Sequence, residues 1–134
     1  MKILYYDCFS GISGDMNLGA MIDLGVDKEY LLNQLNSLGL EGWELILEKD
    51  QRHGISGTKA TVKQTRHEHV HRHLGDIEKI IDESGLKTED KLLSKKIFAK
   101  VALAEAKVHD MPVEKVHFHE VGAVDSIIDI VGAA

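Results

Sequence analysis

Cysteine and clustered positive charge are both nearly absent from the sequence. Cys8 is the only cysteine in 134 residues, which excludes an intrachain disulfide. Lysine and arginine total 16, against 22 aspartate and glutamate residues, and the net charge is −6. Because phosphate contacts need clustered lysine and arginine, and no basic stripe is present, we expect no nucleic-acid partner.

Long apolar runs and targeting segments are missing as well. No apolar stretch approaches the roughly 18 residues of a membrane span, so we expect no membrane partner. The first residues, "MKILYYDCF", become polar too early for a signal peptide, and with the lone cysteine this predicts a cytoplasmic location. No repeat or linker divides the chain, whose 43% apolar content is that of one globular domain over residues 1–134.

The chain closes on "VDSIIDIVGAA", which predicts the opening of a helix capped by Asp125 or Ser126. A helix this apolar normally continues until it covers another surface. We therefore expect a domain truncated at its C-terminal end, with a last helix that is frayed or covered by a partner chain. A homo-oligomer is the expected assembly.

Hydrophobic periodicity predicts a single α/β domain, with mixed α+β as the alternative, built from about four strands and four to five helices. "KILYYDCF" is predicted to be a buried strand, followed by a glycine loop and a helix that ends at Gly25. "WELILEK" and "ISGTKATVKQT" alternate as two strands of a hairpin around the turn "RHG".

The remaining helices are predicted from their caps and stop signals. Asp27 is expected to cap the second helix, and Thr88 a long helix over residues 88–110. "LGDIEKIIDESG" has isoleucines at helical spacing, and after Pro112 the segment "EKVHFHEV" is expected to be a short strand or an extended loop.

Four histidines occupy every second position of "HEHVHRH": His67, His69, His71 and His73. An extended run places them on one face, and imidazole suits nickel, zinc or copper rather than magnesium or calcium. We predict a mobile, exposed nickel-capture segment between a strand and a helix. A solvated, pH-sensitive loop is the alternative.

A second histidine pair lies in "VHFHEVGAVDS". On a strand His117 and His119 point to the same face and can present two imidazoles to one metal, whereas Glu120 joins them only if the strand ends there. Histidines that only satisfy hydrogen bonds are the alternative. Asp125 and Asp129, four apart, either add oxygen ligands or solvate their helix. Metal binding is expected to weaken as the pH falls through about 6.5.

The loop in "DCFSGISGDM" is a candidate anion site. Its backbone amides at a helix N-terminus favour a phosphate, and the candidate binding residues are Ser10, Gly11, Ser13 and Gly14. The loop lacks the Walker lysine and the G-x-G-x-x-G pattern. Because a tight strand-to-helix turn also needs glycine, a purely structural role stays open.

Four motifs together resemble the nickel insertion proteins called LarC: "YDCFSGISGDM", "HGISGTKATV", the histidine run with "HLGDIEKII", and "VHFHEVGAVDSIIDIVGA". The resemblance implies a nickel chelatase, a lyase that completes the nickel-pincer cofactor of lactate racemase. The substrate would be pyridinium-3,5-bisthiocarboxylic acid mononucleotide, with CTP consumed and magnesium or manganese assisting. Members of the family are longer, with the CTP site in a C-terminal domain, so this chain would be the N-terminal part. Its implied partners are that C-terminal domain, cofactor-synthesis proteins and lactate racemase.

The chemistry of nickel insertion then assigns roles to the candidates. His117 and His119 are expected to hold nickel, with the four-histidine run as feeder. Glu120 or a neighbouring histidine is expected to accept the proton that the pyridinium carbon loses, and Asp15 is the second catalytic candidate. Two alternatives stay open: a non-enzymatic histidine-rich nickel metallochaperone, and a metal-dependent phosphohydrolase that uses Asp7, Asp15 and the His117 pair.

Overall fold

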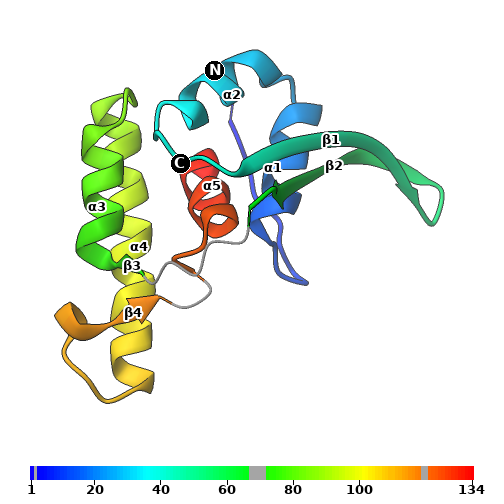
Figure 1. Ribbon diagram of the computed structural model, residues 1–134. Coiled ribbons are helices and arrows are strands. Elements are labelled where there is room, and N and C mark those ends of the chain that lie inside the picture. The colour runs from blue at the N-terminus through cyan, green and yellow to red at the C-terminus, as the bar shows by residue number, and fades with distance from the viewer. Residues whose placement is uncertain (2, 67–71, 119–120) are drawn as a thin grey trace.

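The computed structural model describes residues 1, 3–66, 72–118 and 121–134. Within these ranges the chain forms helices and two separate antiparallel strand pairs, β1–β2 and β3–β4 (Figure 1). The elements are α1 (Gly14–Asp23), α2 (Lys28–Asn36), β1 (Trp43–Arg52), β2 (Ile55–Gln64), β3 (Arg72–His73), α3 (Leu74–Glu83), α4 (Thr88–Val108), the 3-10 helix η1 (Val113–Lys115), β4 (His117–Phe118) and α5 (Val124–Ala133). This mixed α/β architecture confirms the predicted fold class.

Strands β1 and β2 form a long hairpin, as their alternating sequence predicts. The register pairs Trp43 with Gln64 and Arg52 with Ile55. The turn residues His53 and Gly54 have φ angles of 50° and 81°. A type I′ turn needs positive φ at both central positions, and its twist matches that of the strands. The predicted turn at "RHG" is therefore confirmed.

Helix α1 packs directly on the backbone of β2. A Cβ atom built on Gly19 would lie 2.1 Å from the Thr58 carbonyl oxygen, so the approach requires glycine. At the end of the helix the Asp23 carboxylate accepts hydrogen bonds from Lys49 Nζ (2.7 Å), the Thr58 hydroxyl (2.7 Å) and the Thr58 amide (2.6 Å). The bond from Lys49, followed by those from Thr58, lowers the pKa of Asp23 to about 2.

Helix α5 lies at the centre of the molecule, in contact with α1, α2, α4 and β2 (Figure 1). Its buried apolar side chains are Val124, Ile127, Ile128 and Val131. The prediction of a frayed last helix is therefore wrong, because the other elements cover its apolar face. The cap prediction is also wrong: the N-cap is Ala123, and neither Asp125 nor Ser126 occupies that position.

Helices α3 and α4 pack on each other at one end of the molecule (Figure 1). Their contact buries Ile77 and Ile81 of α3 together with Phe98 and Ala102 of α4. The observed α4 confirms the long helix expected over residues 88–110. No helix in the described ranges is both long and apolar enough to cross a bilayer.

Two helix caps show how the predicted starts compare with the observed ones. Asp27 caps α2 as expected, and its Oδ1 accepts a hydrogen bond from the Tyr30 amide at 2.7 Å. The cap predicted for α4 is wrong by one residue: Lys87 is the N-cap, and Thr88 is already helical. Helix boundaries commonly shift by this amount.

The segment before α1 departs from the prediction. The described residues of "KILYYDCF" lie outside any strand, and the side chains of Ile3 and Tyr5 are 76% and 82% exposed. A strand requires a hydrogen-bonded neighbour. The buried strand predicted here is therefore wrong for this structure, since no described segment pairs with these residues.

Candidate functional site

The strand pair β3–β4 brings the two histidine motifs together. His73, the last residue of "HEHVHRH", lies opposite His117 in the antiparallel register. Their imidazole rings are tilted by 47°, and the ring centroids are 4.0 Å apart. Metal–nitrogen bonds are about 2 Å long, so these two neighbouring rings need only a small movement apart to become adjacent ligands of a single metal ion.

His73 is held in place by both of its neighbours in the fold. Its ring Nδ1 lies 3.1 Å from the Val116 carbonyl oxygen, and its backbone amide donates to Asp76 Oδ2 at 2.8 Å. Donation to this carbonyl requires the proton on Nδ1, and in the neutral imidazole that tautomer has its lone pair on Nε2. A histidine metal ligand commonly has this arrangement, in which a carbonyl fixes the tautomer.

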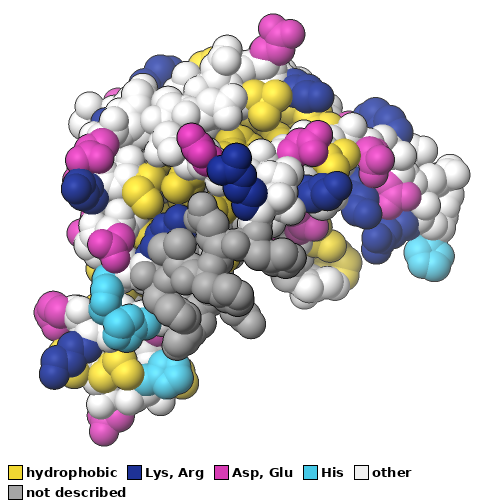
Figure 2. Space-filling model, in the orientation of Figure 1, with side chains coloured by type: hydrophobic (Ala, Val, Ile, Leu, Met, Phe, Trp, Pro, Cys, Tyr) yellow, Lys and Arg dark blue, Asp and Glu magenta, His cyan; other side chains and the backbone are white. Residues whose placement is uncertain are grey.

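The other predicted histidine ligands cannot be placed in the same way. His67, His69, His71, His119 and Glu120 lie outside the described residues. His117 is exposed, whereas His73 is half-buried in β3 and also forms the N-cap of α3, so His73 itself is not part of a loop. Figure 2 shows histidine side chains gathered at the end of the molecule that carries β3 and β4.

The predicted phosphate loop leads into α1. Ser10, Gly11 and Ser13 are exposed, and Gly11 has a φ of 84° and donates its amide to the Cys8 carbonyl at 2.9 Å. Asp15 Oδ1 accepts hydrogen bonds from the Ser13 hydroxyl and, at 2.8 Å, from the Met16 amide. Asp15 Oδ2 has no such partner among the described residues. Oδ2 is therefore available to accept a proton or a further hydrogen bond.

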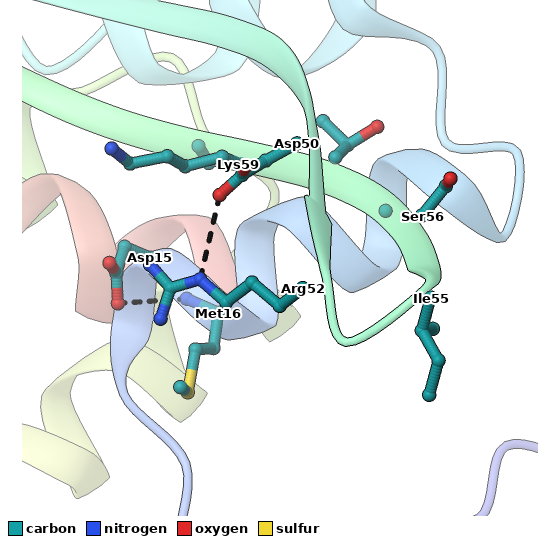
Figure 3. A pocket seen from close by; sticks show the side chains of 10 residues that line it. Asp15, Met16, Asp50, Arg52, Ile55, Ser56 and Lys59 are labelled. Carbon is teal, nitrogen blue, oxygen red and sulfur yellow. Dashed lines mark hydrogen bonds and ion pairs between the residues drawn. The ribbon is translucent and has the colours of Figure 1, made fainter.

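Asp15 also lines a groove between the start of α1 and the outer half of the hairpin (Figure 3). The groove has a volume of about 400 Å³, and its lining residues are Asp15, Met16, Asp50, Arg52, Ile55, Ser56, Gly57, Thr58, Lys59 and Ala60. Arg52 Nε lies 3.6 Å from Asp50 Oδ2, and in Figure 3 the Arg52 side chain extends toward Asp15. The groove therefore combines two cations and two carboxylates with apolar surface.

Carboxylates from α1 and α5 meet behind this loop. A Cβ atom on Gly14 would lie 2.4 Å from Asp129 Cβ, so only glycine allows the two helices to meet here. Asp129 Oδ1 is buried and has no hydrogen-bond partner. Burial, followed by the negative charges of Asp15 and Asp125, raises the pKa of Asp129 to about 6. Asp125 faces elsewhere, since its Oδ1 accepts from Gln64 Nε2 at 3.1 Å.

The sequence interpretation missed two features of this site. It did not anticipate that Arg52 and Lys59 line one groove, although it placed Arg52 in the hairpin turn and Lys59 in the second strand. It also did not pair His73 with His117, because their contact depends on strand pairing between distant parts of the chain.

In the described ranges no cluster of three or more histidine, cysteine or carboxylate side chains is positioned to hold a metal. Asp7, a candidate ligand in the phosphohydrolase alternative, is exposed.

Comparisons with known proteins agree on one family. The family model described as "Nickel insertion protein" matches residues 4–134. A putative nickel insertion protein of Dictyoglomus thermophilum is 52% identical over 133 residues, which make up 99% of this chain and 34% of the relative. A pyridinium-3,5-bisthiocarboxylic acid mononucleotide nickel insertion protein of Acetivibrio thermocellus is 52% identical over 142 residues, with 100% and 35% covered. The chain thus spans about a third of the length of these relatives. No solved structure matches it.

Proposed function

Because the chain belongs to the nickel insertion protein family, we propose that it is the N-terminal part, residues 1–134, of a nickel chelatase acting on pyridinium-3,5-bisthiocarboxylic acid mononucleotide. The family match confirms the resemblance predicted from the four motifs. The observation that carries the proposal is the pairing of His73 with His117, which joins the two histidine motifs.

Nickel is the metal substrate in this proposal, and His73 and His117 are two of its ligands. In the tautomer that donates to the Val116 carbonyl, His73 Nε2 carries the lone pair that binds metal, and the neighbouring His117 ring is exposed. Imidazole is a donor that nickel accepts and can exchange, unlike a closed cage of thiolates. His119 and the run of His67, His69 and His71 are the further ligands that we propose from the sequence.

The groove beside α1 is the proposed site of the mononucleotide. Arg52 and Lys59 offer positive charge to the phosphate and thiocarboxylate groups, while Asp15 and Asp50 offer negative charge to the pyridinium ring. The loop Ser10–Gly14 lies at the N-terminus of α1, where an anion is favoured.

Metallation also needs a base. When nickel bonds to the pyridinium carbon, that carbon loses a proton, which a carboxylate in the site must accept. Asp15, which lies in the groove with Oδ2 available, is the proposed acceptor among the described residues. Glu120 remains a candidate from the sequence.

The remaining steps of the reaction are proposed for the longer protein. The resemblance assigns CTP, with magnesium or manganese, to a C-terminal domain, and it assigns the finished cofactor to lactate racemase. A cytoplasmic location suits this intracellular cofactor chemistry. CTP supplies the energy of the reaction when bound, while this chain's own residues bind nickel, orient the mononucleotide and take up a proton.

Nickel titration calorimetry tests whether His73 and His117 bind nickel. We expect His73→Ala and His117→Ala each to weaken nickel binding by about tenfold or more, since each removes a ligand. His53→Asn is the control, because it removes an imidazole at the hairpin turn and asparagine tolerates the positive φ there. Unchanged nickel affinity in both ligand variants would overturn the metal assignment.

A second titration separates the chelatase from the metallochaperone alternative. With nicotinic acid mononucleotide as probe, we expect the double variant Arg52→Gln, Lys59→Gln to bind about tenfold more weakly. Lys79→Gln, which removes an exposed lysine of α3, is the matched control. Nickel binding without any mononucleotide binding would favour the metallochaperone. Hydrolysis of generic phosphoesters with manganese, and no nickel insertion, would favour the phosphohydrolase.

A further inference from the structure

Residues 3–9, the N-terminal segment, run beside α1 with an unpaired backbone. In the described part of the chain, the first backbone–backbone hydrogen bond is the one from the Gly11 amide to the Cys8 carbonyl. The amides and carbonyls of residues 3–7 therefore have no backbone partner among the residues that the structure describes. These residues are Ile, Leu, Tyr, Tyr and Asp, and four of the five are types enriched in strands or buried apolar segments. The segment thus lies outside any helix or strand, and its backbone groups are not paired with any described residue.

The two faces of the N-terminal segment have different surroundings. The Tyr6 hydroxyl donates to Asn17 Oδ1 at 3.0 Å, and Asn17 is buried on α1. On the opposite side Ile3, Tyr5 and Phe9 are 76%, 82% and 94% exposed. Several large apolar side chains exposed together mark an interaction surface. Leu4 and Tyr6, on the side toward α1, are 55% and 48% exposed, so this side is only partly covered and the side of Ile3, Tyr5 and Phe9 is the more exposed one.

The relatives supply a candidate partner. They match 99% to 100% of this chain with only 34% to 35% of their own length, so roughly two thirds of each relative has no counterpart here. We infer that the N-terminal segment is a strand of a sheet that the additional part of the longer protein completes. The partner is a β-strand that pairs with residues 3–7, together with apolar side chains that cover Ile3, Tyr5 and Phe9. This inference rests on family membership and not on nickel chemistry.

A second copy of this chain fits the segment less well. Pairing between two copies of the N-terminal segment would satisfy one backbone edge of each strand and leave the other edge free. It would also leave the exposed face without a covering layer. A strand that is apolar on both faces is typical of the interior of an α/β sheet, where other strands and helices enclose it.

Hydrogen exchange measured by mass spectrometry tests the inference on two proteins without substitutions, this chain and a full-length relative. The amides of residues 3–7 should exchange without protection in this chain. The aligned amides in the full-length Dictyoglomus thermophilum relative should exchange at least about tenfold more slowly. Equal, unprotected exchange in both proteins would overturn the inference. Protection that grows with the concentration of this chain alone would show that the partner is a second copy, and would overturn it too.

A matched pair of variants tests the exposed face. Ile3→Asp and Ile55→Asp change side chains that are 76% and 78% exposed, so neither should alter the melting temperature of this chain by more than about 2 °C. In a chimera that carries this chain in place of the matched third of the same relative, Ile3→Asp should lower the melting temperature by about 5 °C or more, and Ile55→Asp should not. Equal effects of the two substitutions in the chimera would contradict the proposed contact.

Discussion

Asp129 is a carboxyl group that the fold places where a charge is unfavourable. Its Oδ1 is buried and has no hydrogen-bond partner, and its side chain lies directly against Gly14. Burial and the charges of Asp15 and Asp125 raise its pKa from an ordinary value of 3.8 to about 6. The protonated form is therefore favoured in the folded state up to about pH 6.

This raised pKa predicts how stability depends on pH. Between about pH 4 and pH 6 the folded chain binds more protons at Asp129 than the unfolded chain, so this contribution to stability is lost as the pH rises. Because Asp129 is partly exposed, we expect a loss of only about 1 kcal/mol. Asp129→Asn should remove this dependence and raise the stability at pH 7.5, as measured by urea unfolding at several pH values.

Asp110→Asn provides the control for this experiment. Asp110 is exposed and has a positive φ of 48°, which asparagine tolerates well. The substitution removes one exposed carboxyl group, so the pH dependence of stability should stay that of the wild type. If Asp129→Asn behaves in the same way as Asp110→Asn, Asp129 is not the group responsible.

At the scale of elements, the contact between α1 and β2 depends on the absence of a side chain. The helix approaches the strand so closely that the Thr58 carbonyl oxygen occupies the space of a Cβ atom on Gly19. The hydrogen bonds of Asp23 to Lys49 and Thr58 then hold the end of the helix on the hairpin. This contact also forms the wall of the groove, because Met16 and Thr58 both line it.

A pair of glycine substitutions measures this contact. Gly19→Ala should destabilise the fold by about 2–3 kcal/mol, because backbone rather than a flexible side chain must move. Gly75→Ala in α3 is the matched control: no atom lies within 4 Å of its Cβ position, and alanine should stabilise that helix by about 0.5 kcal/mol. Urea unfolding midpoints give both values. A Gly19→Ala variant as stable as the wild type would show that α1 and β2 are not in close contact.

At the scale of the whole molecule, the histidine pair joins two distant parts of the chain. β3 directly precedes α3, and β4 belongs to the connection from α4 to α5, so a metal bound by His73 and His117 would tie the α3–α4 end to the central helix. Phe118, the residue after His117, reinforces this connection, since its ring centroid lies 6.4 Å from that of Phe98 on α4.

Nickel should therefore stabilise the entire fold. A ligand that binds only the folded state at 100 times its dissociation constant adds about 2.7 kcal/mol, which should raise the melting temperature by several degrees. The His73→Ala, His117→Ala double variant should lose this rise, and His53→Asn should keep it. Calorimetric melting with and without nickel makes the measurement. An equal rise in the double variant would mean that nickel stabilises the fold through other residues.

The sequence alone determined the local elements and the family. Helical spacing of apolar residues located α3 and α4, the cap at Asp27 located α2, and alternation around "RHG" located the hairpin. These signals are readable because they depend on residues close together in the chain. The four motifs were also sufficient to identify the nickel insertion family, since each is a contiguous run of residues.

Tertiary structure alone decided which distant residues meet. The pairing of His73 with His117, the burial of Asp129 and the gathering of Arg52 and Lys59 in one groove all depend on long-range packing. The same reason explains the two element predictions that failed. The apolar face of α5 is covered by segments from across the chain, whereas the strand expected at "KILYYDCF", residues 2–9, lacks a neighbour in the described structure. Periodicity reports neither a partner nor its absence.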